Sequence, residues 1–125
     1  MARLSLSDVR LQDDARFPWL VLIPRRAGAV ELFDLASVDQ TMLLAELAFA
    51  GRAVRALGSE LGRPVEKLNL ANLGNLVPQL HWHVVGRRAD DACWPGPVWG
   101  QGEVVRLSDT DREAALAAVK RALGR

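Results

Sequence analysis

Cysteine is almost absent from this chain of 125 residues, in which Cys93 is the only one. One cysteine cannot form an internal disulfide, and this composition is typical of a reducing compartment. The N-terminus lacks the continuous apolar run of a signal peptide. Nowhere does the sequence approach the ~18 uninterrupted apolar residues that a membrane span needs. We therefore expect a soluble, cytoplasmic protein with no membrane partner.

An excess of charge of one sign is also absent. Sixteen Lys and Arg residues face fifteen Asp and Glu residues, for a net charge of +1. A non-specific nucleic-acid binder would carry a one-signed excess, so no nucleic-acid partner is expected, and any anionic ligand must be held by a local site. Half of the residues are apolar, and internal repeats, low-complexity tracts and linkers are lacking. This predicts one domain over residues 1–125.

The apolar pattern predicts a hairpin near the start of the chain. Residues 9–11 and 17–23 read as strands, and the polar turn 12–16 lies between them. The second strand is apolar without alternation until Pro24 ends it. We therefore expect a central strand that is covered on both faces.

A long amphipathic helix is predicted next. Residues 37–40, Ser-Val-Asp-Gln, resemble a capping box, and Gly62 and Pro64 are expected to end the helix. Between them apolar residues recur every three or four positions, at Leu43, Leu47, Ala50, Val54, Leu57 and Leu61.

The rest of the chain predicts strands over residues 65–70 and 79–85, joined by the loop 72–75. A short strand over 104–107 and a last helix over 108–125 follow, the helix capped by Ser108 and ended by Gly124. Strand pairs with one long helix and a C-terminal helix predict an α+β fold with a mainly antiparallel sheet.

Both histidines of the chain lie in one segment, Gln79-Leu80-His81-Trp82-His83-Val84-Val85. Side chains two apart in a strand point to the same face. Gln79, His81 and His83 are then expected to share a polar face. The residues between them form an apolar face for the core.

Three interpretations of the polar face are open. The histidines could be solvated residues on an exposed face of the sheet. They could bind a metal, although a catalytic zinc site needs a third protein ligand, and no spacing points to Cys93 or to a carboxylate. Alternatively, one imidazole attacks an electrophile while the other handles charge on the same substrate. A histidine attacks through one ring nitrogen if the other donates its proton to a fixed acceptor.

The segment resembles the motif of the histidine triad family, in which three histidines alternate with apolar residues on one strand. Residues 19–26 resemble the family's apolar strand that ends in proline and basic residues, and residues 32–35 resemble its entry into the long helix. Asn72-Leu73-Gly74 resembles the family's Asn-x-Gly, and Trp94-Pro95-Gly96-Pro97-Val98-Trp99 is similar to the Trp-Pro segments of some members. This resemblance implies the histidine-triad fold, a nucleotide ligand and a homodimer with joined sheets.

By this resemblance, His81 matches the middle histidine, which attacks the α-phosphate and forms a nucleotidyl-histidine intermediate. His83 matches the last histidine, which contacts the phosphate and helps the leaving group to depart. Gln79 stands where the family has its first histidine, whose backbone carbonyl orients the nucleophilic ring. Trp19 stands where many members carry a further histidine. The resemblance implies a nucleotide hydrolase or nucleotidyl transferase. The alternative, which the two departures favour, is a nucleotide-binding module with little turnover.

The resemblance also implies residues that bind substrate. Asn72 is the candidate for the α-phosphate oxygen, Asn75 for a further phosphate contact, and Asp13 or Asp14 for the ribose hydroxyls. Stabilisation of turns would also explain these residues. The expected ligand is a purine nucleoside phosphate, with no cofactor and no metal. The segment 94–99 would pack across a subunit interface or cover the base, and the interface is favoured because tryptophan is enriched at protein contacts.

Overall fold

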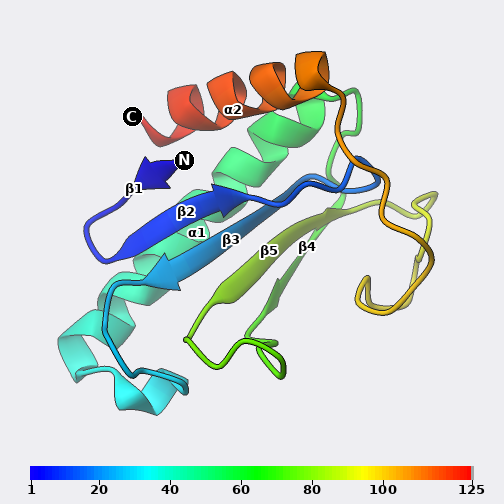
Figure 1. Ribbon diagram of the computed structural model, residues 1–125. Helices are drawn as coiled ribbons and strands as arrows, with labels where there is room; N and C mark the ends of the chain where they lie inside the picture. Colours follow the sequence, from blue (N-terminus) through cyan, green and yellow to red (C-terminus); the bar gives the residue numbers. More distant parts are fainter. Residues whose placement is uncertain (125) are drawn as a thin grey trace.

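The computed structural model describes residues 1–124, and in them it has one five-stranded sheet and two α-helices (Figure 1). The elements follow in the order β1 (Ala2–Arg3), β2 (Ser7–Leu11), β3 (Trp19–Pro24), a 3-10 turn (Leu32–Asp34), α1 (Ser37–Glu60), β4 (Lys67–Ala71), β5 (Trp82–Arg87) and α2 (Asp109–Leu123). The strand order is β1-β2-β3-β5-β4, and every neighbouring pair is antiparallel. The predicted α+β fold is confirmed.

Strand β3 is the centre of the sheet. It pairs with β2 on one side and with β5 on the other, so that Leu22 lies opposite both Val9 and Trp82. Five of its six residues are buried, because the helices cover one face and a second apolar cluster covers the other. The predicted hairpin and the predicted central strand are both confirmed.

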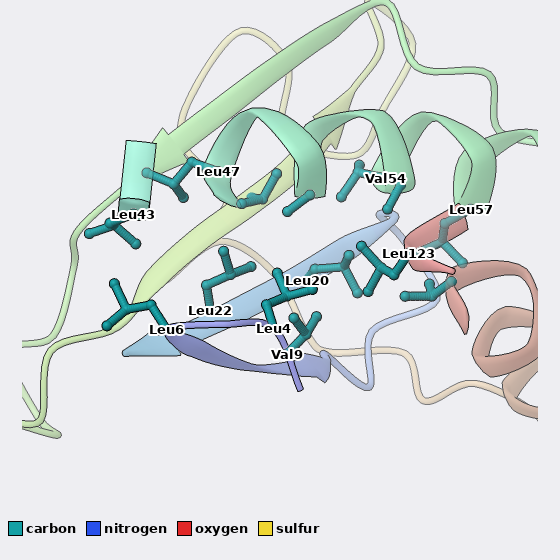
Figure 2. Close-up of a cluster of buried hydrophobic side chains, with 14 of the residues drawn as sticks. Leu4, Leu6, Val9, Leu20, Leu22, Leu43, Leu47, Val54, Leu57 and Leu123 are labelled. Atoms are coloured by element: carbon teal, nitrogen blue, oxygen red, sulfur yellow. The ribbon is translucent and has the colours of Figure 1, made fainter. Parts of the chain in front are cut away.

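The main core lies between the sheet and the two helices. Figure 2 shows Leu20 and Leu22 of β3 facing Val54 and Leu57 of α1, with Leu123 of α2 beside them. The apolar face predicted around the histidines belongs to this core: Leu80 and Val84 are buried in it, and Trp82 is half-buried against it. The histidines therefore lie on the face that looks away from α1.

The start of α1 differs from the expected capping box. Ser37 is already helical, and the residue before it, Ala36, is the N-cap without a side-chain hydrogen bond. The side-chain amide of Gln40 donates instead to the carbonyl of Leu35. The 3-10 turn just before the helix sets the direction of the chain, and its own capping box joins Glu31 and Asp34. At the other end Leu61 is the C-cap, and Gly62 follows with the positive φ of 69° that suits glycine.

The four predicted strands that form have shifted bounds, by two or three residues at their starts, and a fifth is not formed. Strand β5 begins at Trp82, because the N–H of Leu80 donates to Ala29 in the loop after β3 and not to a neighbouring strand. Strand β4 likewise covers Lys67–Ala71 in place of 65–70. Residues 104–107 form no strand, because their backbone hydrogen bonds run to the irregular turn 12–16: the Val105 carbonyl accepts from the N–H of Ala15, and the N–H of Leu107 donates to the Asp13 carboxylate.

The C-terminal helix has the predicted caps, although α2 covers Asp109–Leu123 and the last residue of the predicted range, 125, lies outside the described residues. The Ser108 hydroxyl accepts a hydrogen bond from the N–H of Asp111, and Gly124 closes the helix in the left-handed conformation. Within residues 1–124, no helix combines the length and apolar character that crossing a membrane requires.

Candidate active site

The ring of His81 is oriented by a backbone carbonyl. Its Nδ1 lies 2.7 Å from the carbonyl oxygen of Gln79. A carbonyl only accepts, so Nδ1 carries the proton and Nε2 carries the lone pair. The ring is half-buried at the start of β5. His81 is therefore held in the tautomer that a histidine nucleophile needs.

Gly74 allows the loop after β4 to lie directly against this ring. A Cβ atom at position 74 would come within 2.8 Å of Cε1 of His81 and 2.9 Å of the carbonyl oxygen of Val77. Real Cβ contacts are longer than this, so any other residue would displace the ring or the loop. The Asn-x-Gly motif indicated this glycine in the sequence, but its contact with His81 could not be predicted.

His83 is buried, and each of its ring nitrogens faces a protein group. The indole N–H of Trp19 donates to Nδ1 at 3.1 Å, and Nε2 lies 3.1 Å from the carbonyl oxygen of Leu73. The rings of His83 and His81 are edge to face, with their centroids 5.1 Å apart. Burial lowers the pKa of His83. The hydrogen bond to Leu73 opposes this effect, and a positive charge on His81 would lower the pKa of His83 further. His83 is thus a neutral ring beside the nucleophile candidate.

Gln79 contributes its carbonyl to the histidine face, whereas its side chain points elsewhere. The side-chain amide lies 3.5 Å from the carbonyl of Pro24 and 3.3 Å from that of Arg26, which are long hydrogen bonds. The structure therefore brings the two histidine rings together as the sequence pattern indicated. The side-chain amide of Gln79 does not lie with these rings, because Gln79 precedes the regular strand β5.

Asn72 and Asn75 lie on the loop that flanks the histidines. Ala71 at the end of β4 is opposite His83, and the loop that starts there supplies the Leu73 carbonyl. Both asparagines are exposed. Their position next to His83 and His81 is compatible with phosphate contacts, which remain a prediction.

Asp13 and Asp14 lie at the other end of β3. The turn that holds them adjoins the Trp19 end of the strand, whereas the segment with His81 adjoins the Leu22 end. These ends are three residue steps apart along β3, a distance of about 10 Å. The structure does not bring these carboxylates to the nucleophile candidate.

Both carboxylates are also engaged in structural contacts. Asp13 accepts the N–H of Leu107 and pairs with Arg106 and Arg112, which fastens the segment before α2 to the turn. Asp14 is buried and accepts two hydrogen bonds from the guanidinium of Arg16. These contacts give Asp13 and Asp14 a structural role in the turn 12–16.

The tryptophan-proline segment folds onto the histidine face of its own chain. Val98 is buried against Trp19, and the ring of Trp99 lies edge-on to His83 with centroids 5.2 Å apart. Trp94 remains partly exposed. Trp99 therefore lies beside the candidate site, and a contact of this segment across a subunit interface remains a prediction.

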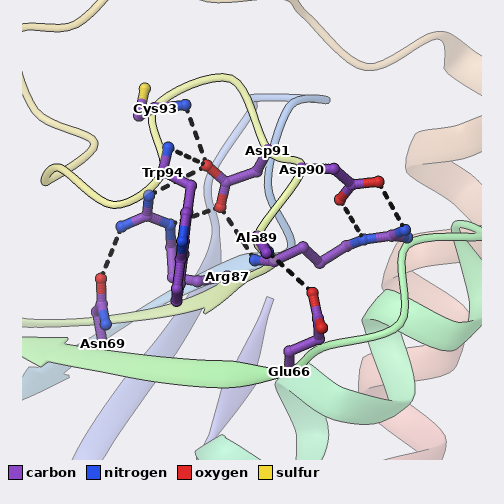
Figure 3. A network of polar contacts seen from close by, with 9 residues as sticks. Glu66, Asn69, Arg87, Ala89, Asp90, Asp91, Cys93 and Trp94 are labelled. Atoms are coloured by element: carbon purple, nitrogen blue, oxygen red, sulfur yellow. Dashed lines mark hydrogen bonds and ion pairs between the residues drawn. The ribbon is translucent and has the colours of Figure 1, made fainter.

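An ion pair that the sequence analysis missed attaches this segment to the sheet. Figure 3 shows Arg87 at the end of β5 bound through two nitrogens to Asp91 and through a third to Asn69 of β4. Its guanidinium also lies 5.6 Å from the ring centres of both Phe17 and Trp94. Arg87 is 1% exposed, so it is a buried anchor for residues 88–99.

Asp91 is held as a carboxylate by several donors. Burial alone would raise its pKa, but hydrogen bonds from Arg87 and from the N–H groups of Arg88 and Cys93 outweigh burial, and the pKa falls from 3.8 to about 2. In a sequence, an arginine and an aspartate four apart across a turn look like ordinary surface charges. Only their burial identifies them as an anchor.

The site combines a candidate nucleophile, His81, with the neutral hydrogen-bonding ring of His83 and the exposed loop amides of Asn72 and Asn75. His81 offers a lone pair on Nε2, and His83 lies beside it. Within residues 1–124, no three His, Cys, Asp or Glu side chains gather as a metal site would require. This arrangement suits attack on an electrophilic phosphorus or acyl centre.

Comparison with known proteins identifies the family. The model of the HIT domain matches residues 3–90. Among solved structures, a histidine triad protein (blr8122) from Bradyrhizobium japonicum is 42% identical, with a TM-score of 0.90 over 98% of this chain and 87% of that one. A histidine triad (HIT) protein from Sinorhizobium meliloti 1021 is 39% identical, with a TM-score of 0.87 over 98% of this chain and 87% of that one.

A third structure, a histidine triad protein from Marinobacter aquaeolei VT8, is 34% identical, with a TM-score of 0.84 over 98% of this chain and 85% of that one. A comparison with curated proteins found no match. The chain belongs to the histidine triad family, whose members generally bind nucleotides and hydrolyse or transfer them.

Proposed function

We propose that this chain hydrolyses a nucleoside phosphate ester, anhydride or phosphoramidate, or transfers its nucleotidyl group, through an intermediate on His81. The hydrogen bond of 2.7 Å between Nδ1 of His81 and the Gln79 carbonyl carries this proposal. It leaves the Nε2 lone pair free to attack phosphorus. Membership of the histidine triad family supports a nucleotide as the ligand.

The protein's contribution would be positioning and charge stabilisation, as is usual in phosphoryl chemistry. The loop after β4 lies against both histidines, so Asn72 and Asn75 are the amides best placed to hold phosphate oxygens. His83 would donate its Nε2–H to the same phosphate in place of its hydrogen bond to the Leu73 carbonyl. A ribose contact from Asp13 or Asp14 receives no support from their ion pairs, and we leave it out of the mechanism.

A nucleotide-binding module with little turnover is the second candidate. The observation that favours it is the pair of protein groups on His83, because Trp19 and Leu73 occupy both of its ring nitrogens. A binding module would bind a nucleoside monophosphate at the same face but would leave its esters intact.

We also propose that two copies of the chain associate along β4. This strand is at the edge of the sheet and pairs only with β5 within residues 1–124. An open edge calls for a covering partner. Beside it lies a mainly apolar groove between α1 and the sheet. Its lining consists of Leu32, Leu43, Leu44, Leu47, Leu70 and Trp82, together with the polar residues Gln40 and Thr41. A second copy that continues the sheet would cover both features.

The experiment that tests the proposed reaction compares three alanine variants on one nucleotide ester. His81→Ala should lower turnover by about 10³-fold or more, because it removes the covalent step, while nucleotide binding stays within about tenfold. His83→Ala should cost about 10²-fold, as the loss of one donor. Gln79→Ala should cost least, because its carbonyl remains. Equal losses for Gln79→Ala and His81→Ala would refute the role given to the carbonyl.

A further inference from the structure

His83 is held from both sides by groups that require the same position of its proton. The indole N–H of Trp19 donates to Nδ1 at 3.1 Å, and an indole nitrogen cannot accept. Nε2 faces the carbonyl oxygen of Leu73 at 3.1 Å, and a carbonyl cannot donate. Both neighbours therefore select the neutral tautomer with the proton on Nε2.

Protonation of His83 would break this arrangement. An imidazolium carries an N–H on each nitrogen, so Nδ1–H would point at the N–H of Trp19. The indole is not free to turn away, because it is 5% exposed and packs edge-on against Phe17 and Trp99. A charged His83 would also be desolvated, since only 9% of the residue is exposed.

Within residues 1–124, the groups that contact His83 supply no opposite charge that would offset this cost. Its contacts from β3, from the loop after β4 and from the segment 94–99 are the uncharged groups of Trp19, Leu73 and Trp99. The titratable group that acts on it is His81, whose charge would repel a second positive charge. His83 thus remains a donor of one hydrogen bond and is a poor source of a proton.

We propose that Trp19 is a positioning residue that keeps His83 neutral and thereby restricts the reaction to leaving groups that depart without taking up a proton. Such substrates are nucleotides joined through a P–O bond to phosphate or to another acidic group. Phosphoramidates are disfavoured, because their amine must be protonated before it leaves. This inference rests on the proposed function and narrows its substrate class.

The reaction then needs no acid from the protein. The Nε2 lone pair of His81 forms a bond to phosphorus, and the P–O bond breaks with its electron pair leaving on oxygen as an anion. A water oxygen next bonds to phosphorus, the P–N bond breaks with its pair returning to Nε2, and the proton of that water passes to solvent. The proton on Nδ1 of His81 stays there throughout, hydrogen-bonded to the Gln79 carbonyl.

The tautomer can be measured without any substrate. Long-range ¹H–¹⁵N spectra of the wild-type protein should show His83 as the Nε2–H tautomer, and it should stay neutral at a pH where an ordinary histidine, with a pKa of ~6.5, is half protonated. Trp19→Phe keeps an aromatic ring but removes the donor, so His83 should titrate at a higher pH in that variant. Trp99→Phe is the matched control, because Trp99 contacts the ring of His83 without donating to it. An Nδ1–H tautomer or an ordinary titration of His83 in the wild type would overturn the proposal.

The substrate restriction is measured with two adenosine compounds, the 4-nitrophenyl ester of AMP and adenosine 5′-phosphoramidate. The kcat/KM of the ester should exceed that of the amidate by about 10²-fold or more, the usual contribution of a missing general acid. The ratio should fall by about tenfold in Trp19→Phe, where His83 can be protonated, and should stay unchanged in Trp99→Phe. A wild type that prefers the amidate, or a ratio that Trp19→Phe leaves unchanged, would overturn the restriction. Failure of both compounds would overturn the proposed hydrolysis and the restriction with it, whereas the spectra would still decide the state of His83.

Discussion

The ring of His81 is placed by backbone atoms on two sides, the Gln79 carbonyl and the close approach of Gly74. Neither contact depends on a charged side chain, so the orientation of His81, the proposed nucleophile, does not vary with the charge of a neighbouring carboxylate. This also explains why a glutamine can stand at position 79 without loss of the orienting bond. What the site requires there is a carbonyl in the right place.

Gly74 provides a direct test of this placement. In Gly74→Ala, the new methyl group would come within 2.8 Å of Cε1 of His81 and should push the ring out of line. Because misplacement of a reacting group by about 1 Å costs about 10²-fold, we expect kcat/KM to fall by about 10- to 10²-fold with little change in melting temperature. Gly96→Ala, whose methyl group comes no closer than 3.3 Å to the Cys93 carbonyl, is the control. Full activity in Gly74→Ala would show that the ring is not held as described.

At the scale of elements, the segment 88–99 runs from the end of β5 back over the face of the sheet that carries the histidines. Arg87 and Asp91 fix its start, Trp94 lies over the guanidinium, and Trp99 reaches His83. The segment has no regular secondary structure over most of its length, so its position depends on these side chains. Loss of the ion pair between Arg87 and Asp91 should therefore destabilise the fold and also displace Trp99 from His83.

The anchor predicts a specific dependence of stability on pH. The pKa of Asp91 lies at about 2 in the folded chain, below its ordinary value of 3.8. A depressed carboxyl pKa stabilises the fold above the ordinary value, and this contribution is lost as the pH falls toward the folded value. It amounts to about 2–3 kcal/mol. Asp91→Asn should be less stable than the wild type by about this amount at neutral pH, as measured by urea unfolding.

The difference in unfolding free energy between wild type and Asp91→Asn should shrink as the pH falls from 3.8 to about 2. Asp90→Asn is the matched control, because Asp90 pairs with Arg88 at the surface and its side chain is 70% exposed. Such surface pairs contribute at most about 1 kcal/mol. A difference for Asp91→Asn that is constant over this range would rule out the ion pair as its source.

The elements that the sequence could predict are those whose pattern is local. The apolar run 17–23 and the spacing of Leu43, Leu47 and Leu57 belong to a strand and a helix that the structure contains. The two-residue strand β1 and the 3-10 turn are too short to have a pattern. The strand predicted over 104–107 was wrong because these residues have no partner strand with which to form a ladder.

The candidate site could be predicted only where neighbours in sequence are neighbours in space. His81, His83 and the Gln79 carbonyl lie within five residues, and alternation was enough to place the two rings on one face. Trp19 lies 64 positions before His83, and nothing in either segment indicates their hydrogen bond. The same holds for the Leu73 carbonyl, whose role depends on how the loop returns to β5.

At the scale of the whole molecule, the two faces of the sheet have different uses. One is filled by α1 and α2, and the other carries the histidines under the segment 94–99. The open β4 edge and its apolar groove remain as an outer surface. The cytoplasmic location expected from the single cysteine stays a prediction.

The association of two copies along β4 can be tested by sedimentation at micromolar concentration. The wild type should sediment as a dimer. Leu44→Glu should sediment as a monomer, because it places a charge in an apolar groove where the leucine is 69% exposed in the single chain. Val104→Glu is the control, since Val104 is 60% exposed but lies in the connection before α2. A monomeric wild type, or a dimer that Leu44→Glu leaves intact, would contradict this interface.

The central claim is that Nε2 of His81 forms a covalent bond to the phosphorus of a nucleotide. Rapid quenching of the wild type with a radiolabelled AMP ester, followed by digestion and mass spectrometry, tests it most directly. The account predicts one nucleotidyl group on the peptide that contains His81, labile to acid as phosphorus–nitrogen bonds are, and none in His81→Ala. Turnover of the ester without any label on His81, or label that persists in His81→Ala, would contradict it.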